Sequence, residues 1–464
     1  MMLLVAGTLF MEILDGTILA TAAPHMAAHL HVQPQQVAVA ITAYLITMAV
    51  LIPLSGWLAD RFGARTIYLG GIAVFTGASA LCASSGTLAE LTALRVLQGA
   101  GGALMVPVGR MIVLRATDKR DLVRAVAYLT WPALAAPIAA PLAGGLLTTY
   151  LSWRWIFLIN VPIGAVALIA AVRLVPQVHG ETRDALDWPG FLLTAVCLGA
   201  LVVAAAALGS PKVDVALVAF AAAASLAAGA AAARHLLAAP EPLLDLRLFR
   251  IPTFRCAHTA GAINRLTIQA VPFLLPLLFQ VGFGWSPVRA GAVVIALFAG
   301  NLGIKPLTTP LLRRFGFRRV IFASGALSAA TMLACAAFAA RTPLALIVVV
   351  LFVSGAARSS GFTAYTTITF ADVDAASMRH ANTITSTATQ LGIGVGVALG
   401  AVALRIGDWT APWFGRSAAT SAYSVAFVLL AALTLLGALR ALRMRGDAGA
   451  QLLGGEPDAL PGSA

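Results

Sequence analysis

Two carboxylic acids lie deep inside the first apolar segment of the chain. Glu12 and Asp15 stand well inside it, whereas the other acids fall in links, at helix ends or in the C-terminal tail. A charge at the bilayer centre costs roughly 2.5–3.5 kcal/mol on insertion scales, and such groups are usually functional. Three residues apart on a helix, the two acids share a face, where they cannot both ionise easily. A carboxyl that titrates near neutral pH can carry a proton. We therefore expect proton coupling at Asp15 and Glu12; a purely hydrogen-bonding role is the alternative.

A buried cation is the second group with evident chemistry. Arg95 lies about a third of the way into a later apolar segment, and Gln98 follows three residues on, on the same helix face. A buried guanidinium needs a carboxylate or carbonyl oxygens. Arg95 is therefore expected to pair with Asp15 or Glu12, and an ion pair needed only for folding is the alternative.

A set of polar side chains in later apolar segments is predicted to line a substrate cavity. The basic members are Arg265, Lys305 and Arg358, which would favour an anionic substrate if they face the cavity and would snorkel if they lie near helix ends. A polar stripe recurs every four residues and must face a cavity or a neighbouring helix, with helix packing as the alternative. That stripe is Asn382, Ser386 and Gln390. The remaining cavity candidates are Gln98, Gln269, Asn301, Tyr365 and Trp131.

Membrane-spanning helices must position these side chains. The chain has 464 residues, 60% of them apolar and 11% charged, whereas a soluble domain is about 25% charged. Many apolar runs reach the ~18 residues that cross a hydrocarbon core as a helix. This excludes soluble enzymes, DNA-binding domains and secreted disulfide scaffolds. We expect fourteen spans, at about 3–23, 37–58, 66–85, 88–112, 124–147, 154–174, 189–208, 214–236, 254–280, 289–311, 320–340, 344–369, 381–404 and 420–442.

The basic residues predict the orientation. With both termini cytoplasmic, as an even number of spans requires, most of the 31 Lys and Arg fall in cytoplasmic links. The net charge of +13 is therefore a topology and lipid-surface signal, and no nucleic-acid partner is expected. The four Cys stand singly at or inside apolar runs, and no phosphate-binding GxxxxGK[ST] occurs. We expect no metal, cofactor or catalytic residues, and a proton gradient in place of ATP.

An internal repeat indicates two related halves. Residues 61–65 and 314–318 both read Arg-Phe-Gly-x-Arg, each after an apolar segment that ends on the cytoplasmic side. The glycine permits a tight turn. Two six-helix halves with two spans inserted between them explain the pattern. We expect an N-terminal bundle at 1–175, the inserted helices with their links at 176–252, a C-terminal bundle at 253–443 and a disordered cytoplasmic tail at 444–464.

Four signatures together resemble a known family. They are residues 14–18 with Ala23-Pro24, the loop 56–65, the Arg95-x-x-Gln98-Gly99 segment to Gly102, and residues 153–164, Trp-Arg-Trp-Ile-Phe-Leu-Ile-Asn-Val-Pro-Ile-Gly. From about residue 3 to residue 440, the chain resembles the major facilitator superfamily, specifically the fourteen-span drug:proton antiporters of the EmrB/QacA type. Lys305-Pro306 followed by residues 313–316 resembles their MdtD-like subgroup.

The resemblance implies roles for individual residues. Asp15 would be the carboxylate that is protonated, and Arg95 would be linked to proton transfer. The inner gate loop between the halves would comprise Gly56, Asp60, Arg61, Gly63 and Arg65. The antiporter-type motif would be carried by Pro137, Pro141, Gly144 and Gly145, with Ala136 and Ala140 where the family has glycine. Alanine still permits close helix approach, so a packing role is expected to survive.

These observations predict a secondary transporter rather than an enzyme. We expect an all-α, fourteen-helix protein with the major facilitator fold, present as a monomer in the cytoplasmic (inner) membrane of a bacterium. Its partners would be small-molecule substrates, protons and the lipid bilayer. It would export drugs or other small amphipathic compounds in exchange for protons, by alternating access. The alternatives are an exporter of an anionic metabolite or metal chelate and a proton-coupled uptake symporter. A membrane enzyme or receptor would need a metal or nucleophile constellation, and none is evident.

Overall fold

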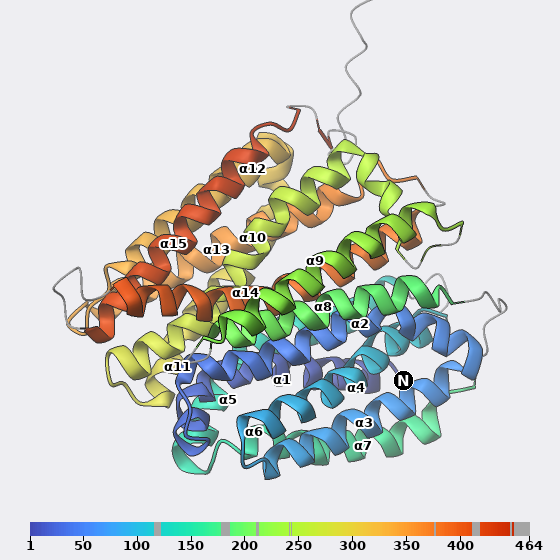
Figure 1. Cartoon of the computed structure of the whole chain (residues 1–464), viewed down its shortest axis with the longest axis horizontal. Helices are drawn as coiled ribbons and strands as arrows, with labels where there is room; N and C mark the ends of the chain where they lie inside the picture. Colours follow the sequence, from blue (N-terminus) through green and yellow to red (C-terminus); the bar gives the residue numbers. More distant parts are fainter. Residues whose placement is uncertain are drawn as a thin grey trace, which may run out of the picture.

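The computed structural model describes residues 1–115, 122–177, 186–209, 213–240, 242, 244–374, 377–410, 418–445 and 448–449. Within these ranges, only the backbone is described for residues 114–115, 122–134, 205–206, 209, 378–379, 382–383, 390 and 418–419. Every regular element in the described ranges is helical. Figure 1 shows helices of the N-terminal half in blue to cyan, helices of the C-terminal half in yellow to red, and a green pair running between them.

The first half is built from long helices and one broken helix. Its elements are α1 (Met2–His29), the short η1 (Pro34–Val37), α2 (Ala38–Phe62), α3 (Ala64–Ser84), α4 (Leu88–Arg115), α5 (Leu122–Tyr150), α6 (Trp155–Leu158) and α7 (Asn160–Leu174). Helix α4 packs against α2 and α3, and α1 packs against α5. The predicted span at 154–174 is divided into α6 and α7 at Ile159.

Two inserted helices lie beside this half. They are α8 (Trp188–Gly209) and α9 (Val215–Ala238), which pack against each other, and η2 (Leu246–Arg250) follows them. Helix α8 also contacts α2, where the rings of Trp57 and Trp188 lie 6.2 Å apart.

The second half repeats the pattern of the first. Its elements are α10 (Pro252–Leu277), the π-helical turn η3 (Leu278–Gly282), α11 (Pro287–Gly303), α12 (Lys305–Ala336), α13 (Leu344–Thr369), α14 (Met378–Thr410) and α15 (Ala418–Ala441). Helix α10 packs against α14, α11 against α13, and α12 against α13 and α15.

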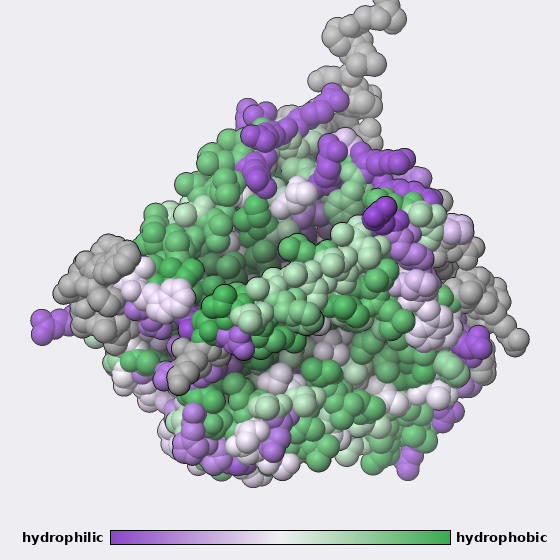
Figure 2. Space-filling view, viewed as in Figure 1, coloured by the Kyte–Doolittle hydropathy of each residue, from purple (hydrophilic) through white to green (hydrophobic). Residues whose placement is uncertain are grey.

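The lengths and composition of these helices fit a membrane. Among the described residues, eleven helices are long and apolar enough to span a bilayer, and the apolar segments Trp188–Ala204 and Pro287–Gly303 are shorter. Figure 2 shows apolar side chains over much of the visible surface, with hydrophilic ones gathered mainly near helix ends. The expected class, an all-α polytopic membrane protein, is confirmed.

The two repeat glycines make the turns expected of them. Gly63 separates α2 from α3 with φ 90°, and Gly316 bends α12 with φ 75°. An L-residue with a Cβ adopts such angles only at a cost, which explains why both copies of Arg-Phe-Gly-x-Arg have glycine at this place.

A second predicted span is also divided. The expected helix at 289–311 is divided, because α11 ends at Gly303 and α12 begins at Lys305. Pro306 is the physical reason, since it has no N–H to donate to the carbonyl one turn earlier. Helix α12 then continues through the Gly316 bend into the next predicted span.

The halves meet through α2 with α14 and α5 with α11. Thr42 Oγ1 donates to the Gly394 carbonyl at 3.1 Å, and Gln280 Nε2 donates to the Thr21 carbonyl at 2.8 Å. Thr42 lies in the second turn of α2 and Gln280 just after α10, near the ends predicted to face the outer side. These contacts therefore hold the predicted outer ends of the halves together.

The antiporter-type motif lies in this contact. A Cβ on Gly145 would be 2.6 Å from the Pro287 carbonyl of α11, and a Cβ on Gly291 would collide with the Pro141 carbonyl of α5. Gly144 packs in the same way on Ile18 of α1. Pro137 is half-buried, and Ala136 and Ala140 are fully buried. The close helix approach expected of the motif is present despite the two alanines.

Candidate functional site

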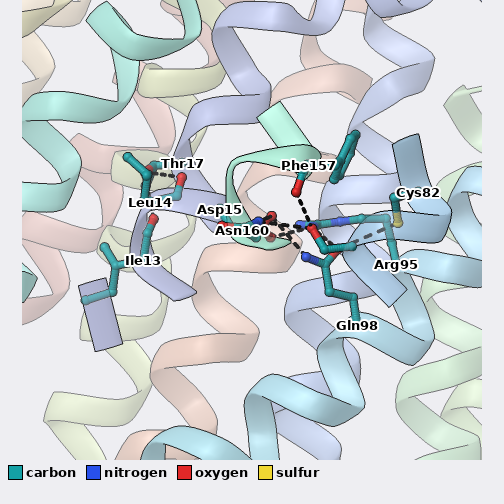
Figure 3. Close-up of polar contacts among 10 residues, drawn as sticks. Ile13, Leu14, Asp15, Thr17, Cys82, Arg95, Gln98, Phe157 and Asn160 are labelled. Atoms are coloured by element: carbon teal, nitrogen blue, oxygen red, sulfur yellow. Dashed lines mark hydrogen bonds and ion pairs between the residues drawn. The ribbon is translucent and has the colours of Figure 1, made fainter. Parts of the chain in front are cut away.

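Helices α1 and α4 bring together the acid and the cation singled out by the sequence. Arg95 Nη1 donates to Asp15 Oδ2 in an ion pair, and both side chains are fully buried. Figure 3 shows the two side chains pointing toward each other from their helices. Of the two partners considered for Arg95, the structure selects Asp15. A pair so far from water gains stability from every further hydrogen bond that its remaining polar atoms make.

Two amides complete the surroundings of Asp15. Gln98 Nε2 donates to Asp15 Oδ1 at 3.0 Å, while its Oε1 accepts from Arg95 Nη1 at 2.8 Å. Asn160 Nδ2, at the start of α7, donates to the same Oδ1 at 2.8 Å. The three hydrogen-bond partners of the carboxyl in the described structure are thus all donors to it. This arrangement fits the ionised form, which only accepts hydrogen bonds.

A hydrogen-bond chain anchors Asn160 in turn. Its Nδ2 also lies 3.1 Å from Ser79 Oγ on α3, and Ser79 Oγ donates to the Phe157 carbonyl at 2.9 Å. The break between α6 and α7 places Asn160 at this point. Sequence reasoning missed both residues as members of the site. An asparagine inside an apolar run was a usable signal for Asn160; Ser79 had none, since small hydroxyl residues are common in packed membrane helices.

An aromatic ring covers the guanidinium. Arg95 Cζ lies 3.9 Å from the ring centroid of Tyr44, within the range of a cation–π contact. Gly99 permits this approach, because a Cβ there would be 2.6 Å from the Tyr44 carbonyl. In the described structure, Arg95 Nε and Nη2 have no hydrogen-bond partner. Two nitrogens of the buried guanidinium are thus left with donors that no described residue accepts.

Glu12 lies one turn before Asp15 and is also buried, at 7% exposure. Its Oε2 has no hydrogen-bond partner among the described residues, and the charges that act on it are Arg110 and Asp15. The two acids thus have different surroundings. Asp15 accepts from one cation and two amides, whereas Glu12 has a carboxyl oxygen without a hydrogen-bond partner in the described structure.

The match to known families covers both halves. The chain matches the family described as the Major Facilitator Superfamily over residues 5–239 and 257–458, which includes Asp15, Arg95 and Asn160. The chain belongs to the Major Facilitator Superfamily. It is therefore a multi-pass membrane transporter of small molecules, as the sequence predicted, and this family membership indicates a transporter rather than an enzyme.

Relatives place it within this superfamily. The chain is 38% identical over 388 residues to a protein of Salmonella typhimurium named multidrug resistance protein MdtD, covering 82% of this chain and 81% of that one. It is 37% identical over 383 residues to the protein of that name from Serratia proteamaculans, covering 82% and 80%. The expected resemblance to the MdtD-like subgroup is confirmed.

Solved structures show the same fold. An auto-inhibited peptide transporter of the POT family superposes with a TM-score of 0.70 at 18% identity, covering 96% of this chain and 97% of that one. A D-xylose–proton symporter superposes with a TM-score of 0.65 at 14% identity, covering 93% and 96%. At such identities the likeness concerns the fold alone, and the expected major facilitator architecture is the one found.

The second half of this major facilitator protein carries its own buried cations. Arg265 and Arg358 lie in the middle of α10 and α13 at 4% and 6% exposure, so neither snorkels from a helix end. Lys305 is half-buried, and its Nζ donates to Thr363 Oγ1 at 3.0 Å.

The other cavity candidates have mixed outcomes. Tyr365 is buried, and its hydroxyl has no partner in the described structure. Gln269, Asn301 and Ser386 are half-buried. The side chains of Asn382, Gln390 and Trp131 lie outside the described residues. A cavity lined by this set stays a prediction.

The loop between α2 and α3 makes contacts within the first half. Arg61 Cζ lies 5.5 Å from the ring centroid of Trp57, and Arg65 Nη2 donates to the Val172 carbonyl of α7. Gly56 and Asp60 are half-buried. The role of this loop as an inner gate between the halves stays a prediction.

Proposed function

We propose that this transporter is a proton-coupled antiporter that exports drugs or other small amphipathic compounds by alternating access. The observation that carries the proposal is the fully buried Asp15 carboxylate, which three donors from α4 and α7 hold. Buried ionisable groups in membrane helices are expensive and are usually functional.

Protonation of Asp15 would change the hydrogen bonds that hold its carboxyl. A proton added to the carboxyl removes the charge that Arg95 neutralises, and the new O–H needs an acceptor where Arg95, Gln98 and Asn160 now present donors. We expect at least one of these three side chains to reorient in response. Because these residues belong to α4 and α7, the proton state of one α1 side chain is coupled to the packing of three helices.

The contacts between the halves support alternation. The hydrogen bonds from Thr42 and Gln280 join the predicted outer ends, so substrate and proton would exchange with the inside in this state. Opening the outer side breaks those contacts and would let Asp15 take up an external proton. Moving one charge through 100 mV supplies about 2.3 kcal/mol, and the pH gradient adds to it.

Export is inferred from relatives, because they carry the name of multidrug resistance proteins. Because a D-xylose–proton symporter has the same fold, the direction of substrate movement relative to protons is measured in the test below. The distribution of basic links supports the bacterial inner membrane with both termini in the cytoplasm.

The test is transport by the purified protein in proteoliposomes with an imposed pH gradient. Ethidium serves as a cationic probe and taurocholate as an anionic one. We compare the wild type with Asp15→Asn, and with Asp214→Asn as the matched control, since Asp214 only caps α9 and asparagine also caps.

We expect Asp15→Asn to lose gradient-driven transport while still exchanging labelled for unlabelled probe, which needs no net proton movement. Equal gradient-driven flux in Asp15→Asn and wild type would overturn the proposal. Movement of probe in the same direction as protons would overturn antiport and favour uptake.

A further inference from the structure

The first helices of the two halves correspond residue by residue around Asp15. Asp15 in α1 and Arg265 in α10 stand equally far from the first residue of their helices. Two residues later each helix has a threonine that bonds back to the same two carbonyl positions. Thr17 Oγ1 donates to the residue 13 and 14 carbonyls at 2.7 and 3.2 Å, and Thr267 Oγ1 donates to the residue 263 and 264 carbonyls at 3.1 and 3.2 Å. Arg265 therefore occupies the place of Asp15.

The partner helices correspond as well. In the first half, Gly99 of α4 lets that helix meet the backbone of α2; in the second, Gly355 of α13 lets that helix meet the Leu297 carbonyl of α11. Arg95 stands four residues before Gly99, and Leu351 stands four residues before Gly355. The second half thus has a base where the first has an acid, and a fully buried leucine where the first has the counter-ion.

Arg265 is left with unused hydrogen-bond donors. Its Nη2 donates to the Ala257 carbonyl at 3.1 Å, but its Nε and Nη1 have no partner among the described residues. Its stem packs against α14, where a Cβ on Gly392 would be 3.1 Å from Arg265 Cβ. The guanidinium is thereby held within the bundle.

The neighbours of Arg265 supply a second donor and no carboxylate. The electrostatic neighbours in the described structure are Tyr365 and His258. The Tyr365 ring packs on Gly261, one turn of α10 from Arg265, and its buried hydroxyl is unpartnered. His258 Nδ1 lies 3.0 Å from the Phe254 carbonyl, and its ring stacks on Phe254, so this histidine is held by packing and by that contact. A buried guanidinium without a counter-ion is costly, and an anion is the partner that relieves the cost.

We propose that Arg265 and the Tyr365 hydroxyl bind the carboxylate or sulfonate group of the transported compound. The inference rests on the proposed function in one respect, that the ligand is the cargo. The two halves then have different roles in transport. The acid of α1 exchanges the proton, and the base at the corresponding place in α10 binds the anionic end of an amphipathic substrate. A guanidinium paired with a hydroxyl suits a planar carboxylate, because it offers several donors in a fixed geometry.

Equilibrium binding tests this assignment without any gradient. The full-length protein in nanodiscs of zwitterionic phosphatidylcholine is titrated with three radiolabelled anions, benzylpenicillin, salicylate and taurocholate, and with the cation tetraphenylphosphonium. The variants are Arg265→Gln, Arg265→Lys and Tyr365→Phe, with Arg255→Gln as the control, since Arg255 is exposed on the same helix.

We expect Arg265→Gln to weaken anion binding about tenfold or more, with cation binding unchanged, and Arg265→Lys to retain part of the affinity. Tyr365→Phe should weaken anion binding severalfold without loss of thermal stability, because the hydroxyl that it removes has no partner in the described structure. If Arg265→Gln does not fold, the anion affinity of Tyr365→Phe tests the proposal. Arg255→Gln should match the wild type.

Several results would overturn the assignment. They are absence of saturable binding of all three anions by the wild type, unchanged anion affinity in the folded variants, and equal loss for anions and cation. Displacement of the anions by added phosphatidylglycerol would place a lipid headgroup at Arg265 and would also overturn it. Because no proton gradient is used, failure here is distinct from failure of proton coupling at Asp15.

Discussion

Removing Arg95 should destabilise the protein far more than removing Arg95 together with its counter-ion. The Arg95→Met variant leaves the fully buried Asp15 carboxylate with two amide donors and no cation. Breaking a buried ion pair on one side costs about 3–5 kcal/mol. Part of this figure reflects the lost cation–π contact with Tyr44 at 3.9 Å, which is worth about 0.5–2 kcal/mol.

The double variant Arg95→Met with Asp15→Asn should recover most of that loss. It has no uncompensated charge, and an asparagine can still accept from Gln98 and Asn160. Paired hydrophobic or neutral replacements of buried ion pairs are often close to neutral. We therefore expect the double variant to be about 2–4 kcal/mol more stable than Arg95→Met, because substitutions of neighbours that share a network are not additive.

The assay is reversible unfolding of the purified protein in mixed dodecyl maltoside and SDS micelles, followed by tryptophan fluorescence. Arg61→Met is the matched control, since Arg61 is exposed and its loss should change the unfolding free energy by less than about 1 kcal/mol. Additive effects of the two substitutions, or a loss for Arg95→Met no larger than that of the control, would refute the buried ion pair.

Three more predictions concern the fold and the site. Gly63→Ala and Gly316→Ala should each lower the unfolding free energy by about 1–2 kcal/mol, since a Cβ is strained at φ 90° and 75°. Gly291→Leu should separate the outer ends of the halves, because its side chain collides with the Pro141 carbonyl; an impermeant maleimide should then label the outer ends faster. Asn160→Ala should cost about 1.5–3 kcal/mol of unfolding free energy, the value of a hydrogen bond to a charged group.

Controls make these outcomes specific. The glycine substitutions are compared with Gly56→Ala, where a Cβ meets nothing within 4 Å. The maleimide experiment uses a cysteine introduced by Thr42→Cys, because Thr42 lies in the contact between the halves. A stability for Gly63→Ala equal to that of Gly56→Ala, or unchanged labelling in Gly291→Leu, would contradict the predictions drawn from the turns and from the interhelical contact.

The sequence predicted that Arg95 pairs with Asp15 or Glu12 because membrane helices contain few charges, and the structure selects Asp15. Two intramembrane acids and a handful of cations leave a short list of partners, and burial forces pairing. Gly63 and Gly316 were predictable for a similar reason, since a repeated glycine at a turn has few explanations. These features depend on rare residues under strong physical constraint.

Other features depended on geometry that the sequence does not carry. Ser79 joins the network only because α3 and α7 pack side by side. The division at Lys305 follows from Pro306, whose helix-breaking effect competes with tolerance of proline in membrane helices. The burial of Arg265 and Arg358 could not be separated from snorkelling, because predicted span ends are uncertain by several residues.

Proton exchange by the Asp15 carboxyl can be observed by pH-difference infrared spectroscopy of the purified protein. On acidification from about pH 8 to about pH 5, a window around the physiological range, we expect a protonated-carboxyl C=O band that Asp15→Asn lacks. Glu12→Gln, measured in parallel, assigns any contribution of the second acid. Identical difference spectra from the wild type and Asp15→Asn would show that the Asp15 carboxyl does not change its protonation state in this range, and would overturn proton coupling at Asp15.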